Sequence, residues 1–286
     1  MTHPAVGPGR TAVITGGASG IGLAAAKRLL ALGMNIEIVD ANDASLEEAK
    51  SAMNDIVTPF AQSIGYWRRD VSDQEAMRDL ARVAFASGPV TILMNNAGVG
   101  GGGHAFENPE GWRRVIETNL FGVSNGVQAF AQAMIDQGMP AAIINTGSKQ
   151  GITTPPGDTA YNVSKAGIKA LTEGLAHTLR NTPGCQVTAH LLVPGFTFTG
   201  MTARRMAEKP PAAWTPEQVV DFMLERMAAG DFYILCPDND VTRQIDNARM
   251  TWAMQDLTQN RPPLSRWHPD YAEAFAAFLK RETGDG

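Results

Sequence analysis

Short apolar runs alternate with longer segments of helical periodicity along most of this 286-residue chain. The apolar runs predict strands, and the helical segments between them imply right-handed crossovers that connect parallel strands. We therefore expect an α/β fold built on a doubly wound parallel sheet, with helices on both faces. The predicted strands are Thr11–Thr15, Asn35–Val39, Gly65–Arg68, Val90–Asn95, Ala141–Asn145, Gln186–Val193 and Phe232–Cys236.

The C-terminal part of the chain follows a different pattern. A helix is predicted from Val241 to about Leu257, and a second one begins near Asp270, after a proline-rich break. Both helices have an apolar face that must be buried. This segment is interpreted either as a lid beside the loop of residues 196–205 or as a clasp over the sheet edge. The expected organisation is a flexible tail over residues 1–10, one α/β domain over residues 11–237 and a helical extension over residues 238–286.

Charge and cysteine content restrict the class of protein. A formal net charge of −5 argues against nucleic acid or an anionic membrane as the main partner. Cys185 and Cys236 show no metal-binding spacing, so we expect no metal site and reduced thiols in a cytoplasmic protein. The first ten residues do not resemble a secretory signal, and the chain contains no apolar run long enough to span a membrane.

A glycine-rich turn joins the first strand to an apolar helix. Its G-x-x-x-G-x-G spacing differs from the common G-x-G-x-x-G fingerprint. Even so, it lets backbone N–H groups approach a pyrophosphate at a helix N-terminus. The candidate dinucleotide-binding residues of this turn are Gly16, Ser19, Gly20, Ile21 and Gly22.

Asp40 follows the second strand, about 20 residues beyond the glycines, where an acidic side chain accepts hydrogen bonds from the adenosine ribose. Its carboxylate would repel a 2′-phosphate. Positions 19 and 41 carry no basic side chain that would attract one. The sequence therefore favours NAD over NADP as the cofactor.

Tyr161 and Lys165 lie four residues apart on a helix predicted from Ala160 to Leu179, so they share one face. An ammonium beside a phenol favours the phenolate, and we expect Lys165 to lower the pKa of Tyr161. Ser148, after the fifth strand, would bring a hydroxyl to the same place. Taken alone, the Tyr-x-x-x-Lys pair also fits a buried tyrosine beside a lysine that reaches solvent.

In combination these segments resemble the short-chain dehydrogenase/reductase family over about Arg10 to Pro237. The resemblance implies a Rossmann-type dehydrogenase domain, and it implies the catalytic set Asn119, Ser148, Tyr161 and Lys165. Tyr161 and Lys165 would also contact the cofactor. Further cofactor contacts implied by the family pattern are Asp70, Val71, Asn96, Ala97, Gly98, Pro194, Gly195, Thr197 and Thr199.

The resemblance also implies a role for each catalytic residue. Tyr161 would exchange the proton of the substrate hydroxyl, and Ser148 would hold the substrate oxygen. Lys165 would bind the nicotinamide ribose, while Asn119 would position a water that links Lys165 to solvent. A local interpretation of Asn119 is that it satisfies a kink in its own helix. Lys149 is excluded as a second catalytic lysine, because neighbours along a strand point to opposite faces.

The function expected from these features is an NAD-dependent oxidoreductase that transfers hydride between nicotinamide and a secondary alcohol or ketone. A non-redox family member, such as an epimerase or dehydratase, and a non-catalytic dinucleotide sensor are the alternatives. The substrate is expected to be a medium-to-large apolar or aromatic small molecule, and no Arg is firmly placed to demand a carboxylate. Candidate substrate contacts are Gln150, Thr154, Phe196, Phe198 and Met201.

The family resemblance further implies a homodimer or homotetramer. The helices that carry Asn119 and Tyr161 would pair with their copies about a two-fold axis. Ile168, Leu171 and Leu175 fit such an interface, although these side chains fit an intramolecular core equally well.

Overall fold

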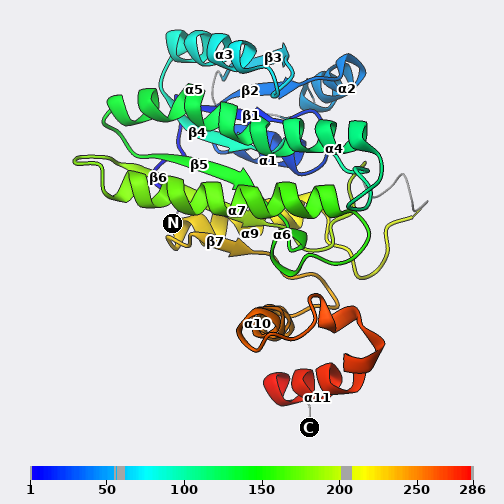
Figure 1. Cartoon of the computed structure of the whole chain (residues 1–286). Coiled ribbons are helices and arrows are strands. Elements are labelled where there is room, and N and C mark those ends of the chain that lie inside the picture. Colours follow the sequence, from blue (N-terminus) through cyan, green and yellow to red (C-terminus); the bar gives the residue numbers. More distant parts are fainter. Residues whose placement is uncertain (1, 55, 57–61, 201–207, 285–286) are drawn as a thin grey trace.

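The computed structural model describes residues 2–54, 56, 62–200 and 208–284. They form an α/β fold with a seven-stranded parallel sheet in the order β3-β2-β1-β4-β5-β6-β7 (Figure 1). This confirms the predicted doubly wound sheet. The strands are β1 (Thr11–Thr15), β2 (Asn35–Asp40), β3 (Ile64–Arg68), β4 (Val90–Asn95), β5 (Ala141–Thr146), β6 (Val187–Val193) and β7 (Tyr233–Leu235).

Helices cover both faces of the sheet. One core lies between the sheet and α1 (Gly20–Ala31), α2 (Asp43–Asn54) and α9 (Pro216–Ala228). The opposite core lies against α3 (Gln74–Ser87), α5 (Gly122–Asp136) and α7 (Thr159–Arg180). Alternate strand residues supply the two cores: in β1, Ile14 belongs to the first and Val13 to the second. The remaining helices of the α/β domain are α4 (Pro109–Ile116), the π-helix Glu117–Phe121 between α4 and α5, and the short α6 (Gln150–Thr153).

Strand order reverses beside β1, which lies between β2 and β4. In open sheets of this kind, ligands bind outside the carboxyl ends of the strands at this switch point. The glycine-rich turn after β1 and the segments after β4, β5 and β6 therefore border the expected ligand site.

The first residues of the chain pack against the sheet, although the sequence predicts a flexible tail there. Ala5 is fully buried, and its carbonyl accepts a hydrogen bond of 2.7 Å from the Thr91 hydroxyl on β4. His3 is also buried, with its ring edge-on to that of His190 on β6. The polar composition and prolines of this segment did not reveal these contacts.

The C-terminal extension has a small core of its own. In Figure 1, α10 (Arg243–Thr258) and α11 (Ala272–Thr283) lie apart from the sheet, below α6. Trp252 and Phe278 are buried between the two helices, and the Trp252 indole donates a 2.8 Å hydrogen bond to Ser265 Oγ. The second helix begins at Ala272 because Pro269–Tyr271 form a 3₁₀ turn.

None of the described helices is long and apolar enough to cross a membrane. The described residues also contain no group of three or more His, Cys, Asp or Glu side chains arranged to hold a metal ion. Both cysteines are free thiols; Cys236 is buried, and burial raises its pKa to about 12.

Candidate active site

The turn after β1 and the segment after β4 are joined by short contacts. Thr15 Oγ1 accepts hydrogen bonds from the backbone N–H groups of Asn96 (3.0 Å) and Ala97 (3.2 Å). The Asn96 side chain donates to the Gly16 carbonyl at 3.2 Å. A Cβ on Gly16 would lie only 2.7 Å from Ala97 Cα, so only glycine fits here. The turn after β1 and the segment after β4 are therefore in contact, as expected for the ends of two neighbouring parallel strands.

The glycine turn presents backbone at the start of α1. Gly16 and Gly20 have φ angles of +59° and +52°, which L side chains rarely adopt. Ser19 is the N-cap of α1, but its side chain makes no capping hydrogen bond, and Ile21 lies in the first turn. A Cβ on Gly22 would lie 2.2 Å from the Gly16 carbonyl oxygen. The close approach and the helix N-terminus fit a pyrophosphate group.

Asp40 lies at the rim of the glycine turn. Its Oδ2 accepts from the backbone N–H of Ala18 at 3.4 Å, and its Oδ1 accepts from that of Asn42 at 3.1 Å. Asp70 is exposed and accepts hydrogen bonds from Ser72, whereas Val71 is buried. Asp40 thus occupies the position expected for a carboxylate that faces an adenosine ribose.

Ser148, Tyr161 and Lys165 are brought together at the end of β5. The Ser148 hydroxyl and the Tyr161 phenol share a hydrogen bond. Lys165 Nζ lies 5.5 Å from the centre of the Tyr161 ring and donates to the Thr146 carbonyl at 2.8 Å. Lys165 is 4% exposed. The alternative interpretation, a lysine that reaches solvent, is therefore not what the structure shows.

Burial dominates the protonation of this group. It raises the pKa of Tyr161 above its usual value, and only the Ser148 hydrogen bond opposes it; the Asp158 carboxylate raises that pKa further. Burial also lowers the pKa of Lys165 to about 8. The prediction that Lys165 lowers the Tyr161 pKa is therefore wrong for this structure. The spacing places the two residues on one face, but it shows neither their burial nor the direction of the ammonium towards Thr146.

Asn119 lies in the π-helix and is fully buried. Its Oδ1 accepts from Val99 N (2.7 Å), and its Nδ2 donates to Val99 O (2.9 Å) and to Ser164 Oγ (3.0 Å). A Cβ on Gly98 would meet both Asn119 Oδ1 (3.4 Å) and Lys165 Nζ (3.6 Å). Because these bonds run to another loop and to α7, the side chain does not serve to satisfy a kink in its own helix.

The loop after β6 completes this edge of the sheet. Thr199 packs over the glycine turn, since a Cβ on Gly20 would lie 3.3 Å from its Cγ2. Thr197 is buried and forms a parallel bridge with Trp214. Met201 lies outside the described residues. The other candidates of this region, Pro194, Gly195, Phe196, Phe198 and Thr154, are half-buried, and Gln150 is exposed.

Two residues of the site were missed by the sequence analysis. Asp158 caps α7 by accepting from Tyr161 N (3.1 Å), and it also binds Gly101 N (2.8 Å). Lys149 Nζ lies 2.6 Å from Asp246 and 3.5 Å from Asp238. The strand argument does not apply to Lys149, because β5 ends at Thr146. Asp158 and Lys149 contact residues that are far away along the chain, so no local sequence pattern indicates these contacts.

Comparison with known proteins assigns the family. A family model described as short chain dehydrogenase matches residues 10–210. The chain belongs to the short-chain dehydrogenase family. Galactitol 2-dehydrogenase (L-tagatose-forming) of Cereibacter sphaeroides is 34% identical over 71% of this chain and 76% of its own length.

Two further relatives match more of the chain. 1-deoxy-11-beta-hydroxypentalenate dehydrogenase of Streptomyces exfoliatus is 30% identical, over 90% of this chain and 94% of its own length. The crystal structure of a short chain dehydrogenase/reductase from Burkholderia phymatum in complex with NAD has a TM-score of 0.79. That structure is 31% identical and covers 90% of this chain and 97% of its own. The protein is an oxidoreductase of this family.

Proposed function

We propose that this protein is an NAD-dependent dehydrogenase that interconverts a secondary alcohol and its ketone. One observation carries the proposal: a serine hydroxyl, a tyrosine phenol and a buried lysine ammonium converge beside a glycine turn that fits a pyrophosphate. Family membership supports the reaction class. The bound nicotinamide would supply the hydride acceptor during alcohol oxidation.

Each catalytic residue has a role that follows from its contacts. The Ser148 hydroxyl, bonded to the phenol, holds the substrate oxygen beside Tyr161 and stabilises the charge that develops on it. Tyr161 exchanges the proton of that oxygen. Its raised pKa keeps the phenol protonated at neutral pH in the ligand-free protein, which suits proton donation to a ketone. Alcohol oxidation requires the phenol to lose its proton first.

Lys165 and Asn119 support this proton exchange. We assign Lys165 to the nicotinamide ribose, because its buried ammonium lies near the Tyr161 ring and the backbone of Gly98. Asn119 fixes the loop after β4 against α7 through Val99 and Ser164. The assigned cofactor contacts are those named from the family pattern, including Tyr161 and Lys165 themselves.

Asp40 supports the choice of NAD. Its carboxylate is fixed beside Ala18 in the glycine turn, where it would accept ribose hydroxyls and repel a 2′-phosphate. Position 41 is an exposed alanine, so no cation compensates there. Phe196 and Phe198 provide an apolar wall for a medium-to-large apolar or aromatic substrate.

The test is a spectroscopic assay of NADH formation with a panel of aryl and alkyl secondary alcohols. We expect turnover with NAD and little with NADP, and we expect Asp40→Ala with Ala41→Arg to reverse that preference. Ala41→Ser is the matched control at the same exposed position. Equal use of both cofactors by the wild type would contradict the Asp40 argument. NAD binding without turnover of any alcohol would instead favour a dinucleotide sensor or a non-redox enzyme.

We also propose a homodimer or homotetramer in the cytoplasm, with a dehydrogenase domain that ends at residue 237. Ile168 is fully buried among the subunit's own residues, and Leu171 packs against the same cluster, so these side chains belong to an intramolecular core. Phe121 at the end of the π-helix and Val163 on α7, by contrast, are 54% and 45% exposed. These two side chains are the better candidates for an isologous contact.

A further inference from the structure

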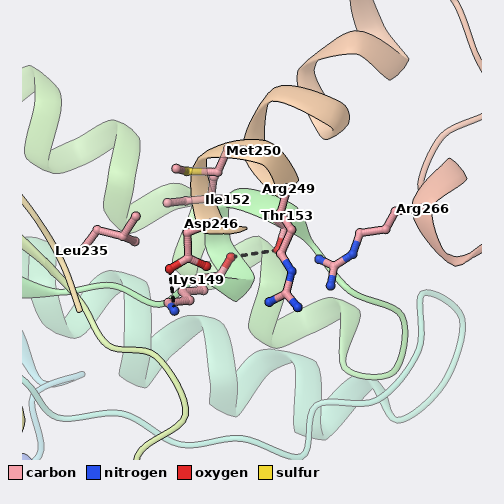
Figure 2. Close-up of a pocket in the computed structure, with 8 residues that line it drawn as sticks. All are labelled: Lys149, Ile152, Thr153, Leu235, Asp246, Arg249, Met250 and Arg266. Carbon is pink, nitrogen blue, oxygen red and sulfur yellow. Dashed lines mark hydrogen bonds and ion pairs between the residues drawn. The ribbon is translucent and has the colours of Figure 1, made fainter. Parts of the chain in front are cut away.

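A small pocket lies where the C-terminal extension meets the segment that follows Ser148. Its volume is about 50 Å³. Ile152 and Thr153 of α6 form one side, and Arg249 and Met250 of α10 form the other. Arg266, from the turn between α10 and α11, closes it. Figure 2 shows the guanidinium groups of both arginines directed towards the space beside Thr153.

The charges around the pocket do not balance. Asp246 also lines it, but its carboxylate is paired with Lys149 at 2.6 Å. Arg249 and Arg266 form no ion pair with any residue that the structure describes, and Arg249 Nε is buried there without a hydrogen-bond partner. Lys149 is shared between Asp246 and Asp238 (3.5 Å), so the three cations Lys149, Arg249 and Arg266 outnumber these two carboxylates by one.

Arg266 shows the consequence of this imbalance. Its guanidinium lies over the rings of Trp267 (4.6 Å) and Phe275 (5.3 Å), and it forms no close ion pair among the described residues. Burial and the neighbouring charge of Arg249 lower the pKa of Arg266 to about 10, although the Asp246 carboxylate opposes this shift. Two guanidinium groups that destabilise each other in a half-buried pocket create a favourable place for an anion.

We propose that this pocket binds the carboxylate of an acidic substrate, so that the preferred substrates are secondary hydroxy acids or the corresponding keto acids. The planar fork of Arg matches a carboxylate in bidentate geometry. A volume of about 50 Å³ has room for one such group. The apolar side chains of Ile152 and Met250 also line the pocket and suit a carbon spacer.

The position of the pocket connects it with the reaction. Lys149 follows Ser148 directly, and α6 runs from there to Thr153. A substrate oxygen held by Ser148 therefore lies at one end of a short segment whose other end borders the two arginines. The inference rests on the dehydrogenase function proposed above. It replaces the expectation that no Arg is placed to demand a carboxylate.

Lys149 holds the two walls of the pocket in place. Its ion pair with Asp246 joins α10 to the segment after Ser148. Asp238, its second partner, accepts from Phe196 N at 3.3 Å in the loop after β6. The carboxylate pocket and the nicotinamide-side loop thus share one buried ionic junction.

The experiment compares hydroxy acids of increasing spacer length with their methyl esters, using the full-length wild type and Arg249→Gln. Charge-assisted hydrogen bonds to a carboxylate are strong, so we expect the KM of the acid to rise about 10- to 100-fold in the variant. The KM of the ester should stay unchanged. Arg249→Lys should restore part of the effect, because it keeps the charge and loses the fork. Arg243→Gln, at an exposed position of the same helix, is the matched control and should alter neither KM.

Arg266→Gln should act like Arg249→Gln, and a thermal denaturation curve will show whether loss of its ring contacts affects folding. If Arg266→Gln impairs folding, Arg249→Gln remains the deciding variant. Equal changes for acid and ester, or a wild type without preference for the acid, would overturn the inference.

A binding measurement separates this inference from the proposed function. Calorimetry of each acid and ester with the NADH-loaded enzyme does not depend on turnover. Acid-selective binding that is lost in Arg249→Gln supports the pocket even if no hydride transfer occurs, and that result would refute only the dehydrogenase function. Turnover restricted to neutral alcohols, with no acid-selective binding, would refute the pocket and leave the dehydrogenase function standing.

Discussion

At the residue scale, burial decides the charge states of Tyr161 and Lys165. Both groups sit in a region where the charged form is disfavoured, so the phenol pKa rises and the ammonium pKa falls. The hydroxyl of Ser148 is the contact that favours the phenolate. The ligand-free site therefore holds a protonated tyrosine beside a lysine whose charge costs stability.

Replacing that lysine should stabilise the protein. The folded-state pKa of Lys165 is about 8 and its ordinary value is 10.5, a difference equivalent to about 3 kcal/mol. Because the folded pKa is the lower one, the cost is fully present below about pH 8 and is relieved as the pH rises towards 10.5. We expect Lys165→Met to unfold at higher urea concentration than the wild type at neutral pH, by about 2 kcal/mol after loss of the Thr146 hydrogen bond.

The same variant should be inactive, because Lys165 is needed for activity although its buried charge lowers the stability of the fold. The stability difference should shrink near pH 10. A variant that is less stable than the wild type at pH 7, or a difference that does not change with pH, would show that Lys165 is not an energetic burden.

At the element scale, the alternating pattern predicts all seven strands because parallel strands buried on both faces are apolar throughout. It extends β7 by one residue at each end, to Phe232 and Cys236, although both of these residues still hydrogen-bond to β6. The motif residues at strand ends could be located because topology alone brings these ends together. The docking of α10 beside α6 could not be predicted, because the ion pair that joins them links Lys149 and Asp246, which are far apart along the chain. The four-residue spacing of Tyr161 and Lys165 likewise did not predict the burial that shifts the pKa values of both side chains.

The docking of α10 should weaken when this ion pair is broken. Asp246→Ala leaves Lys149 with Asp238 alone at 3.5 Å, in a place where both partners are largely buried. Loss of one partner of a buried pair typically costs about 3–5 kcal/mol. We expect faster amide hydrogen exchange across α10 and α11, a raised substrate KM and unchanged NADH binding.

A double variant provides the control for this experiment. Replacing both partners with apolar residues, Lys149→Met with Asp246→Leu, should return hydrogen exchange in α10 part of the way towards the wild-type rate. The buried lysine charge that Asp246→Ala leaves poorly paired is removed, while Asp238 loses its lysine partner. Unaltered exchange in Asp246→Ala would mean that the apolar contacts alone hold the extension. It would also remove the argument that this junction links the extension to the site.

At the scale of the whole molecule, exposed apolar side chains mark a candidate subunit interface. We expect light scattering to show a dimer or tetramer at micromolar concentration. Phe121→Asp should shift the protein towards monomer, because it introduces a charge into an isologous contact. Phe106→Asp is the control, since Phe106 is 92% exposed on the loop before α4 and belongs to neither helix. A wild-type monomer, or equal effects of both substitutions, would contradict the proposed interface.

The central claim of this account is that Tyr161 exchanges the substrate proton, and Tyr161→Phe tests it most directly. The substitution removes one hydroxyl and keeps the ring that packs beside Lys165. The measurement pairs the turnover number with the NADH dissociation constant of the same sample. We predict that turnover falls by about 10²–10⁴, the usual contribution of general acid–base catalysis, while NADH affinity stays within about twofold. Retention of more than about a tenth of wild-type turnover with intact NADH affinity would contradict the assignment.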